Sequence, residues 1–141
     1  MNKKLSFFII SVISSLLLLS WVYVSRESYS VFMSKKTQMN IEKTVINLGQ
    51  LDRNKPQSAI YPFTNTGKNP LIIQQVETSC GCTQPEWPKH PIKPGKKGHI
   101  KVTYDAKYPG RFVKRIKVFC NIEKGYEELV VKGEVLYEDN R

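Results

Sequence analysis

Residues 99–120 read HIKVTYDAKYPGRFVKRIKVFC, and this stretch decides the fold class. Apolar and polar residues alternate on both sides of a central Pro109-Gly110 break. A period of two places successive side chains on opposite faces of a strand, so each half predicts a strand with one buried face. The expected buried faces are formed by Ile100, Val102 and Tyr104, and by Phe112, Ile116 and Val118. The outer face of the second strand is expected to carry Arg111, Arg115 and Lys117.

Further segments of the same kind surround this pair. They span residues 44–49, 58–65, 71–78 and 128–135, and all are rich in Val, Ile, Tyr or Phe. Gly, Pro and Asn cluster between them, and no long amphipathic helix competes. We therefore predict an all-β fold, an immunoglobulin-like β-sandwich of six or seven strands over residues 41–138, in which two antiparallel sheets each bury one face.

Length and composition limit the classes of protein that this chain can belong to. With 141 residues it holds one domain beside a targeting segment, which excludes an enzyme with a cleft between two domains. The chain is 40% hydrophobic and 24% charged, as expected for a globular protein rather than a disordered or collagen-like one.

The N-terminal segment predicts a membrane anchor. Lys3 and Lys4 precede an uncharged run from Leu5 to Val24, and its 20 residues match the hydrocarbon thickness of a bilayer of about 30 Å. We expect a signal anchor and single transmembrane helix in residues 1–25, followed by a polar linker in residues 26–40. A cleaved signal peptide, giving a secreted domain, is the alternative. The short N-terminal tail favours export of the residues C-terminal to the span.

Several motifs resemble a known bacterial family. They are Phe63-Thr64-Asn65-Thr66-Gly67, Pro70-Leu71-Ile72-Ile73, Ser79-Cys80-Gly81-Cys82-Thr83, Pro85, Trp87, Ile92, Pro94-Gly95, Tyr104, Gly110 and Phe112. Together they resemble domain-of-unknown-function family 1573 over roughly residues 44–136. The resemblance implies an exported, Hydin-related immunoglobulin-like sandwich with no established activity. Together with the predicted anchor, it leads us to expect a single-pass protein of the bacterial inner membrane whose domain faces the periplasm. Cys120 departs from the family pattern.

Two thiols two residues apart are the main candidate for chemistry. Cys80 and Cys82 follow a predicted strand, where alternate side chains point the same way, and Gly81 lets the backbone bend between them. Three interpretations stay open. The pair forms an easily reduced disulfide, it provides two thiolates for Cu(I) or Zn(II), or it is two small buried side chains without chemistry.

Topology separates Cys120 from that pair. In an immunoglobulin-like sandwich the strands that end near Cys80 and at Cys120 are antiparallel neighbours, so their ends are expected about 25 Å apart. Cys120 is then expected to be unpaired and inert. The loop with Lys107 and Arg111 is expected at the Cys80 end, where these cations would lower the pKa of a thiol.

Other ligands for a metal are few. His90, in a loop after the thiols, is the one histidine expected near Cys80 and Cys82. The alternative interpretation is that His90 is a solvated loop residue that binds no metal. We predict no resident cofactor.

The exported part is basic. Between Lys89 and Lys117 there are ten Lys or Arg residues and one acidic residue, Asp105. A solvated face beside the membrane is the favoured interpretation of these charges, and a binding face is the alternative. Because an exported domain seldom meets nucleic acid, the targets of such a binding face would be anionic headgroups or wall polymers. The candidate anion-binding residues are Lys89, Lys93, Lys96, Lys97, Lys107 and Arg111.

Enzyme motifs are missing from the sequence. It contains no Ser/His/Asp arrangement, no paired carboxylates beside an aromatic pocket and no phosphate-binding glycine loop. The prediction is a non-enzymatic, membrane-anchored extracytoplasmic module that binds a partner, such as an envelope protein or an anionic polymer, or orders the cell envelope. The alternative is a thiol redox or copper-handling site at Cys80 and Cys82.

Overall fold

A computed structural model describes residues 12–23 and 35–137 of the chain. The chain divides into two units, with the division between Lys35 and Lys36. The described residues of the first unit are a helix over residues 12–23 and Lys35. Among the described residues no helix is long and apolar enough to cross a membrane. The rest of the predicted span, residues 5–11 and Val24, lies outside the described residues, as does most of the predicted linker.

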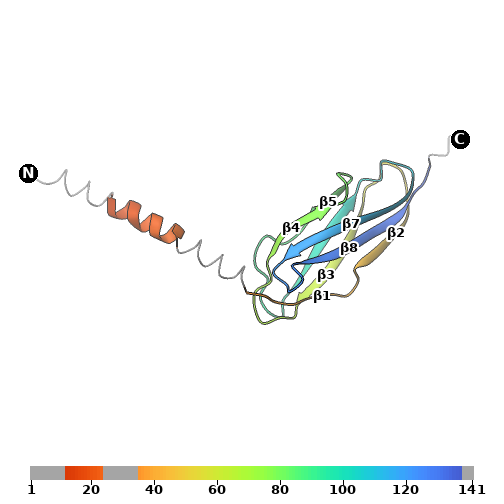
Figure 1. Ribbon diagram of the computed structural model, residues 1–141. Coiled ribbons are helices and arrows are strands. Elements are labelled where there is room, and N and C mark those ends of the chain that lie inside the picture. Colours follow the sequence, from red (N-terminus) through yellow and green to blue (C-terminus); the bar gives the residue numbers. More distant parts are fainter. Residues whose placement is uncertain (1–11, 24–34, 138–141) are drawn as a thin grey trace, which may run out of the picture. The chain divides into compact units, whose positions relative to one another are not determined.

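The second unit is a β-sandwich of two four-stranded sheets (Figure 1). One sheet has the strand order β1-β3-β6-β5 and the other has the order β2-β8-β7-β4. The strands are β1 (Met39–Ile41), β2 (Val45–Leu51), β3 (Gln57–Asn65), β4 (Ile73–Thr78), β5 (Thr83–Glu86), β6 (Lys97–Tyr104), β7 (Gly110–Cys120) and β8 (Tyr126–Val135). The all-β sandwich predicted from the alternation is confirmed.

Three details differ from the prediction. The sandwich has eight described strands rather than six or seven, because β1 and β5, of three and four residues, are too short to show a period. One pair of strands is parallel. After β1, which pairs with β3, the chain crosses to the other sheet, and there β2 runs parallel to β8. The sandwich also begins before residue 41, because Thr37 already bridges to Ile122.

The core between the sheets contains the side chains that the alternation places there. Ile100, Val102 and Tyr104 of β6 are buried, as are Ile116 and Val118 of β7. The two sheets are also joined by polar contact, because the hydroxyl of the buried Tyr61 donates a hydrogen bond of 2.9 Å to the carbonyl of Val130. Burial on this scale supplies most of the stability of a domain of this size.

One end of the sandwich is closed by buried asparagines, and the chain enters the domain there. Asn121 Oδ1 accepts a hydrogen bond of 2.8 Å from the backbone N–H of Ile72, and Asn121 Nδ2 donates one of 2.9 Å to the carbonyl of Pro70. The N–H of Thr37 donates to the carbonyl of Asn121 at 3.0 Å. These bonds attach the first residues of the domain to the start of β4 and the end of β7, and we call this the entry end.

Candidate functional site

The turn between β4 and β5 carries the two predicted thiols at the other end of the sandwich. The structure joins Cys80 and Cys82 in a disulfide with a Cα–Cα distance of 5.3 Å. Two hydroxyls hold the turn, because Thr78 Oγ1 and Thr83 Oγ1 donate to the carbonyl of Cys80 at 2.9 and 3.1 Å. β4 pairs with β7 so that Ile73 lies opposite Cys120 at the entry end and Thr78 lies opposite Ile116. The turn follows Thr78, so it lies at the other end of β4. We call it the disulfide end.

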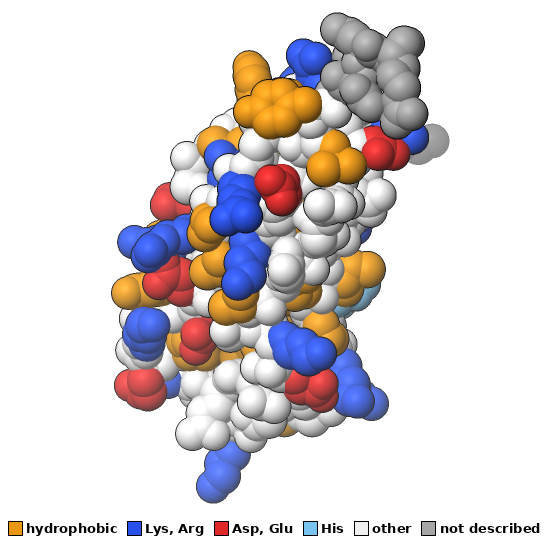
Figure 2. Space-filling model, turned by 90° about the vertical axis from the view of Figure 1, so that its right-hand side faces the viewer, with side chains coloured by type: hydrophobic (Ala, Val, Ile, Leu, Met, Phe, Trp, Pro, Cys, Tyr) orange, Lys and Arg blue, Asp and Glu red, His pale blue; other side chains and the backbone are white. Residues whose placement is uncertain are grey.

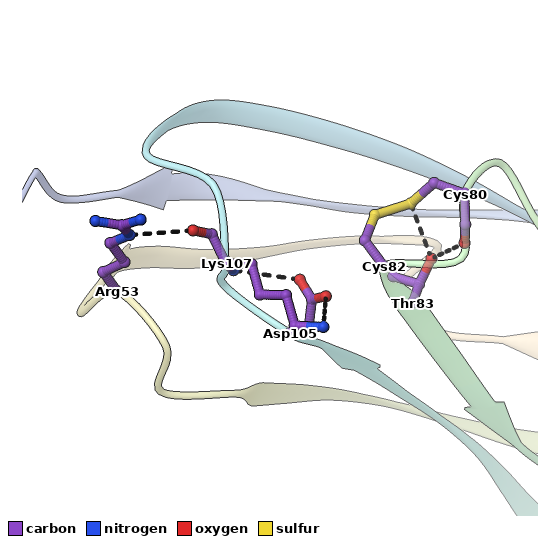
Figure 3. Close-up of polar contacts among 6 residues, drawn as sticks. All are labelled: Arg53, Cys80, Cys82, Thr83, Asp105 and Lys107. Atoms are coloured by element: carbon purple, nitrogen blue, oxygen red, sulfur yellow. Dashed lines mark hydrogen bonds and ion pairs between the residues drawn. A yellow bond between two sulfur atoms is a disulfide. The ribbon is translucent and has the colours of Figure 1, made fainter.

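The two sulfurs have different surroundings, although both cysteines are partly buried. Cys82 packs against the hydrophobic core. Cys80 Sγ lies 3.5 Å from Thr83 Oγ1, and Figure 3 shows this hydroxyl between the sulfur and the carbonyl oxygen of Cys80. This hydroxyl has one hydrogen, which it donates to the carbonyl of Cys80, so it can donate to a Cys80 thiolate by turning away from that carbonyl, which Thr78 Oγ1 continues to bind.

The loop after β6 reaches the disulfide end, where the predicted cations Lys107 and Arg111 each lie near a carboxylate and Arg111 also lines a hollow with Cys80 and Cys82. The N–H of Asp105 donates to the carbonyl of Cys82 at 3.1 Å. Lys107 Nζ lies 3.6 Å from an Asp105 carboxylate oxygen (Figure 3), and Arg111 Nε lies 3.8 Å from Glu134. Arg111 points outward because its strand neighbour Phe112 points into the core. Both cations therefore have carboxylate partners of their own.

A lysine outside the predicted set of site residues lines the same hollow as the two cysteines. Both cysteines and Lys114 line a hollow of about 620 Å³ at the disulfide end. Lys114 shares the inward face of β7 with Phe112 and Ile116, since all three are even-numbered on one strand. The sequence contained the information needed to find Lys114, because the alternation of β7 alone places it on the apolar face. Lys114 was not predicted as a site residue because the other residues on that face are hydrophobic, and the face was interpreted as core.

Cys120 lies at the entry end and pairs in register with Ile73. It is a free cysteine, 2% exposed. Burial raises the pKa of the Cys120 thiol to about 11. The position agrees with the expected separation of Cys120 from Cys80 and Cys82, and a buried neutral thiol is chemically inert.

The candidate metal site is not assembled. β5 carries the chain away from the disulfide end, because Thr83 pairs with Tyr104 and Glu86 with Lys101. His90 follows β5, two residues before Ile92, whose carbonyl is bound by Asn65 at the entry end. Within the part of the chain that the structure describes, no three His, Cys, Asp or Glu side chains are grouped to hold a metal.

The six candidate anion-binding residues do not form one patch. Lys93, Lys96 and Lys97 lie at the entry end, where Asn65 N–H donates to the carbonyl of Lys96, whereas Lys107 and Arg111 lie at the disulfide end. Lys89 lies over the ring of Trp87, with Nζ 2.9 Å from the ring centroid. On the face in Figure 2, Lys and Arg side chains lie among Asp and Glu side chains rather than in a continuous basic area.

These features define an immunoglobulin-like, PapD-like β-sandwich with a Cys-Gly-Cys disulfide turn at one end. The family model described as "Protein of unknown function (DUF1573)" matches residues 39–135, and the chain belongs to this family. The resemblance stated from the sequence is thereby confirmed, and the match begins at β1.

Solved structures share the fold at low sequence identity. A protein of unknown function from Porphyromonas gingivalis W83 is 21% identical, with a TM-score of 0.63 over 72% of this chain and 48% of that one. The chain thus spans about half the length of that protein. The ASH/PapD-like domain 7 of human CEP192 is 9% identical, with a TM-score of 0.63 over 74% of this chain and 89% of that one.

A bacterial chaperone complex shares the fold as well. The CsuC–CsuE chaperone–tip adhesion subunit pre-assembly complex of Acinetobacter baumannii gives 15% identity and a TM-score of 0.54, over 70% of this chain and 52% of the matched chain. None of the curated proteins compared matches this chain.

Proposed function

We propose that this chain is a membrane-anchored, extracytoplasmic module of the bacterial cell envelope that binds a partner through its disulfide end. One observation carries the proposal: the chain enters the domain at one end of the strands, at Thr37, and the Cys80–Cys82 turn lies at the other. An anchor formed by the run from Leu5 to Val24 would therefore be followed by a domain whose disulfide end lies about 25 Å beyond its attachment. Periplasmic exposure would place that end where envelope partners can reach it.

The form of the two ends supports binding rather than catalysis. The entry end is occupied by the domain's own N-terminal segment, whereas the disulfide end has a hollow lined partly by Tyr104, Tyr108 and Phe112. Tyr108 is 73% exposed, and exposed aromatic side chains commonly contribute to protein interfaces. The chaperone–adhesin complex is a case in which this fold binds a protein. The basic residues are divided between the two ends, which favours a protein partner over an anionic polymer.

The anchor is tested by expressing the full chain in a bacterium. We expect the protein to remain in the membrane pellet after alkaline extraction, and the domain to be cut by protease added to spheroplasts. Leu17→Arg combined with Leu18→Arg introduces charges into the apolar run and is expected to weaken membrane retention. A full-length protein that washes off at high pH, or a domain protected from external protease, would contradict the proposal.

Contact with a partner is tested by photo-crosslinking in intact cells. A photoreactive amino acid at Tyr108 reports on the disulfide end, and the same amino acid at the exposed Lys68 reports on the entry end. We expect a discrete adduct with an envelope component from position 108 that is absent from position 68. Equal adducts from both positions, or adducts from position 68 alone, would contradict binding through the disulfide end.

A second candidate function is thiol–disulfide exchange at Cys80 and Cys82. It is supported by a half-buried disulfide that lines a hollow at the surface rather than lying in the core. The copper-handling alternative depends on the same chemistry, because Cu(I) binds thiolates and the pair must first be reduced.

The test of this candidate is the mass of the exported full chain after alkylation, with and without a mild dithiol. We expect the mild dithiol to open the Cys80–Cys82 bridge under native conditions while Cys120 stays unlabelled. A bridge that opens only after unfolding would remove both the exchange and the copper candidates, and it would leave the binding module untouched.

A further inference from the structure

The register of β4 and β7 brings Lys114 and Cys80 to the disulfide end. Thr78 pairs with Ile116, Ser79 N–H donates to the carbonyl of Arg115 at 3.1 Å, and Arg115 N–H donates to Ser79 Oγ at 3.3 Å. Cys80, which follows Ser79, and Lys114, which precedes Arg115, both line the hollow at this end.

The neighbours of Lys114 on β7 differ from it in their partners. Arg111 lies near Glu134, and Arg115 lies near Glu128 at 3.6 Å, both on the outer face. Among the described residues, Lys114 has no carboxylate within ion-pair distance. The hollow that it lines contains the two cysteines, and its other titratable side chains are Tyr104, Tyr108 and Arg111, while Asp105 and Lys107 pair with each other on the adjoining loop.

From this arrangement we propose that Lys114 stabilises the thiolate formed when an exported protein dithiol reduces the Cys80–Cys82 disulfide, and that the hollow receives the peptide carrying the attacking cysteine. The proposal rests on the thiol-exchange candidate and deepens it. Lys114 supplies a positive charge and Thr83 supplies a hydroxyl 3.5 Å from Cys80 Sγ. Tyr108, the exposed aromatic residue of the lining, supplies contact area for the peptide beside the attacking cysteine.

The reaction is a two-electron exchange. A thiolate of the partner attacks one sulfur of the bridge, a mixed disulfide forms, the Cys80–Cys82 bond breaks, and the leaving sulfur takes the electron pair as a thiolate. The second thiolate of the partner then attacks the partner's sulfur in the mixed disulfide. This step releases the cysteine of the present chain that was held in the mixed disulfide. The partner ends as a disulfide, and Cys80 and Cys82 end as thiolates that take up the two protons released by the partner.

Charged small thiols test the role of Lys114 in the full-length chain. The rate of bridge opening is measured with anionic 2-mercaptoethanesulfonate and with cationic cysteamine. Each rate reports the stabilisation of the leaving thiolate, and the ratio of the two rates reports whether the charge of Lys114 acts at the bridge. Relative to the wild type, Lys114→Gln is expected to lower the ratio roughly three-fold or more at low salt, and Lys114→Arg to preserve it. Arg115→Gln is the matched control, since it removes the same charge from the outer face of the next residue.

A pH profile gives the second measurement. In the reduced protein, Lys114→Gln is expected to move the midpoint of Cys80 and Cys82 alkylation to higher pH, because a nearby cation lowers the pKa of a thiol. A ratio and a midpoint unchanged in Lys114→Gln would overturn the proposal while the exchange candidate stood. A wild-type bridge that resists both thiols until the domain unfolds would overturn the exchange candidate itself, and the role of Lys114 with it.

Discussion

Thr37 Oγ1 donates a hydrogen bond of 2.9 Å to Asn65 Oδ1, and both side chains are buried. Asn65 Oδ1 also accepts a hydrogen bond of 3.1 Å from the N–H of Gly67. Asn65 Nδ2 donates to the carbonyls of Asn69 and Ile92 at 2.8 Å each. These four bonds use both lone pairs and both hydrogens of the amide. One side chain thus joins the N-terminal segment to the loops that follow β3 and β5.

Replacing this amide is expected to be costly. Asn65→Ala leaves buried donors and acceptors without partners, and we expect the free energy of unfolding to fall by about 3 kcal/mol. Urea denaturation followed by tryptophan fluorescence gives the value. The exposed Asn40 in β1 offers a control, because Asn40→Ala is expected to change stability by less than about 0.5 kcal/mol. Equal effects at the two positions would show that the network around Asn65 contributes little.

Gly67 is required by close approach of the N-terminal segment. A Cβ at this position would overlap Thr37 Oγ1 and the backbone nitrogen of Gln38. We expect Gly67→Ala to lower the free energy of unfolding by about 2 kcal/mol through this overlap. Gly81→Ala is the matched control, since a Cβ at Gly81 meets no atom within 4 Å. A thermal melt compares the two variants, and a Gly67→Ala protein as stable as Gly81→Ala would contradict this close packing.

Tyr61 links the pH dependence of stability to the contact between the sheets. Burial raises the pKa of Tyr61 above its ordinary value of 10.0, so the unfolded chain loses this proton first as the pH rises. The contribution of this pKa difference to the free energy of unfolding is complete below about pH 10 and is lost at higher pH. Tyr61→Phe should cost about 1 kcal/mol at pH 7, from the lost bond to Val130, and should make the decline above pH 10 less steep.

Denaturation curves between pH 7 and 11 measure both effects. The exposed Tyr108 provides the comparison, and Tyr108→Phe is expected to leave the stability and its pH profile as in the wild type. Identical profiles for Tyr61→Phe and the wild type would contradict the assignment.

Cys120 should not react in the folded protein. With its pKa raised to about 11 by burial, only about one thiol in a thousand is ionised at pH 8. We expect iodoacetamide to label Cys120 only after denaturant unfolds the domain, as followed by peptide mapping. Rapid labelling of native protein would place this thiol at the surface and would contradict its position opposite Ile73.

The fold could be predicted from the sequence because two of its long strands carry a clear alternation. β6 and β7 alternate over 8 and 11 residues, which is enough to define both the strand and its buried face. β1 and β5 were missed because a period of two is not visible in three or four residues. The parallel pairing of β2 with β8 was missed because strand direction depends on where the chain crosses between sheets, which the sequence of β2 does not record.

The candidate site was predicted in part. The Cys-Gly-Cys spacing indicated that the two sulfurs can meet, since their approach depends on only three residues. His90 was expected beside them because it is close in sequence, but β5 carries it to the entry end. Lys107 was expected to act on the sulfurs, but it lies near Asp105, a carboxylate two residues away that satisfies its charge locally.

The sequence by itself determined six of the eight described strands, their buried faces, the possibility that Cys80 and Cys82 meet, and the separation of Cys120 from that pair. Each of these follows from residues adjacent in the chain or from the direction of neighbouring strands. Only the tertiary structure decided that Lys114 lines one hollow with Cys80 and Cys82, and that Asn65 binds the segment containing Thr37. Lys114 and Cys80 are 34 positions apart and Asn65 and Thr37 are 28 apart, and their placement depends on strand register and sheet packing, which local alternation leaves open.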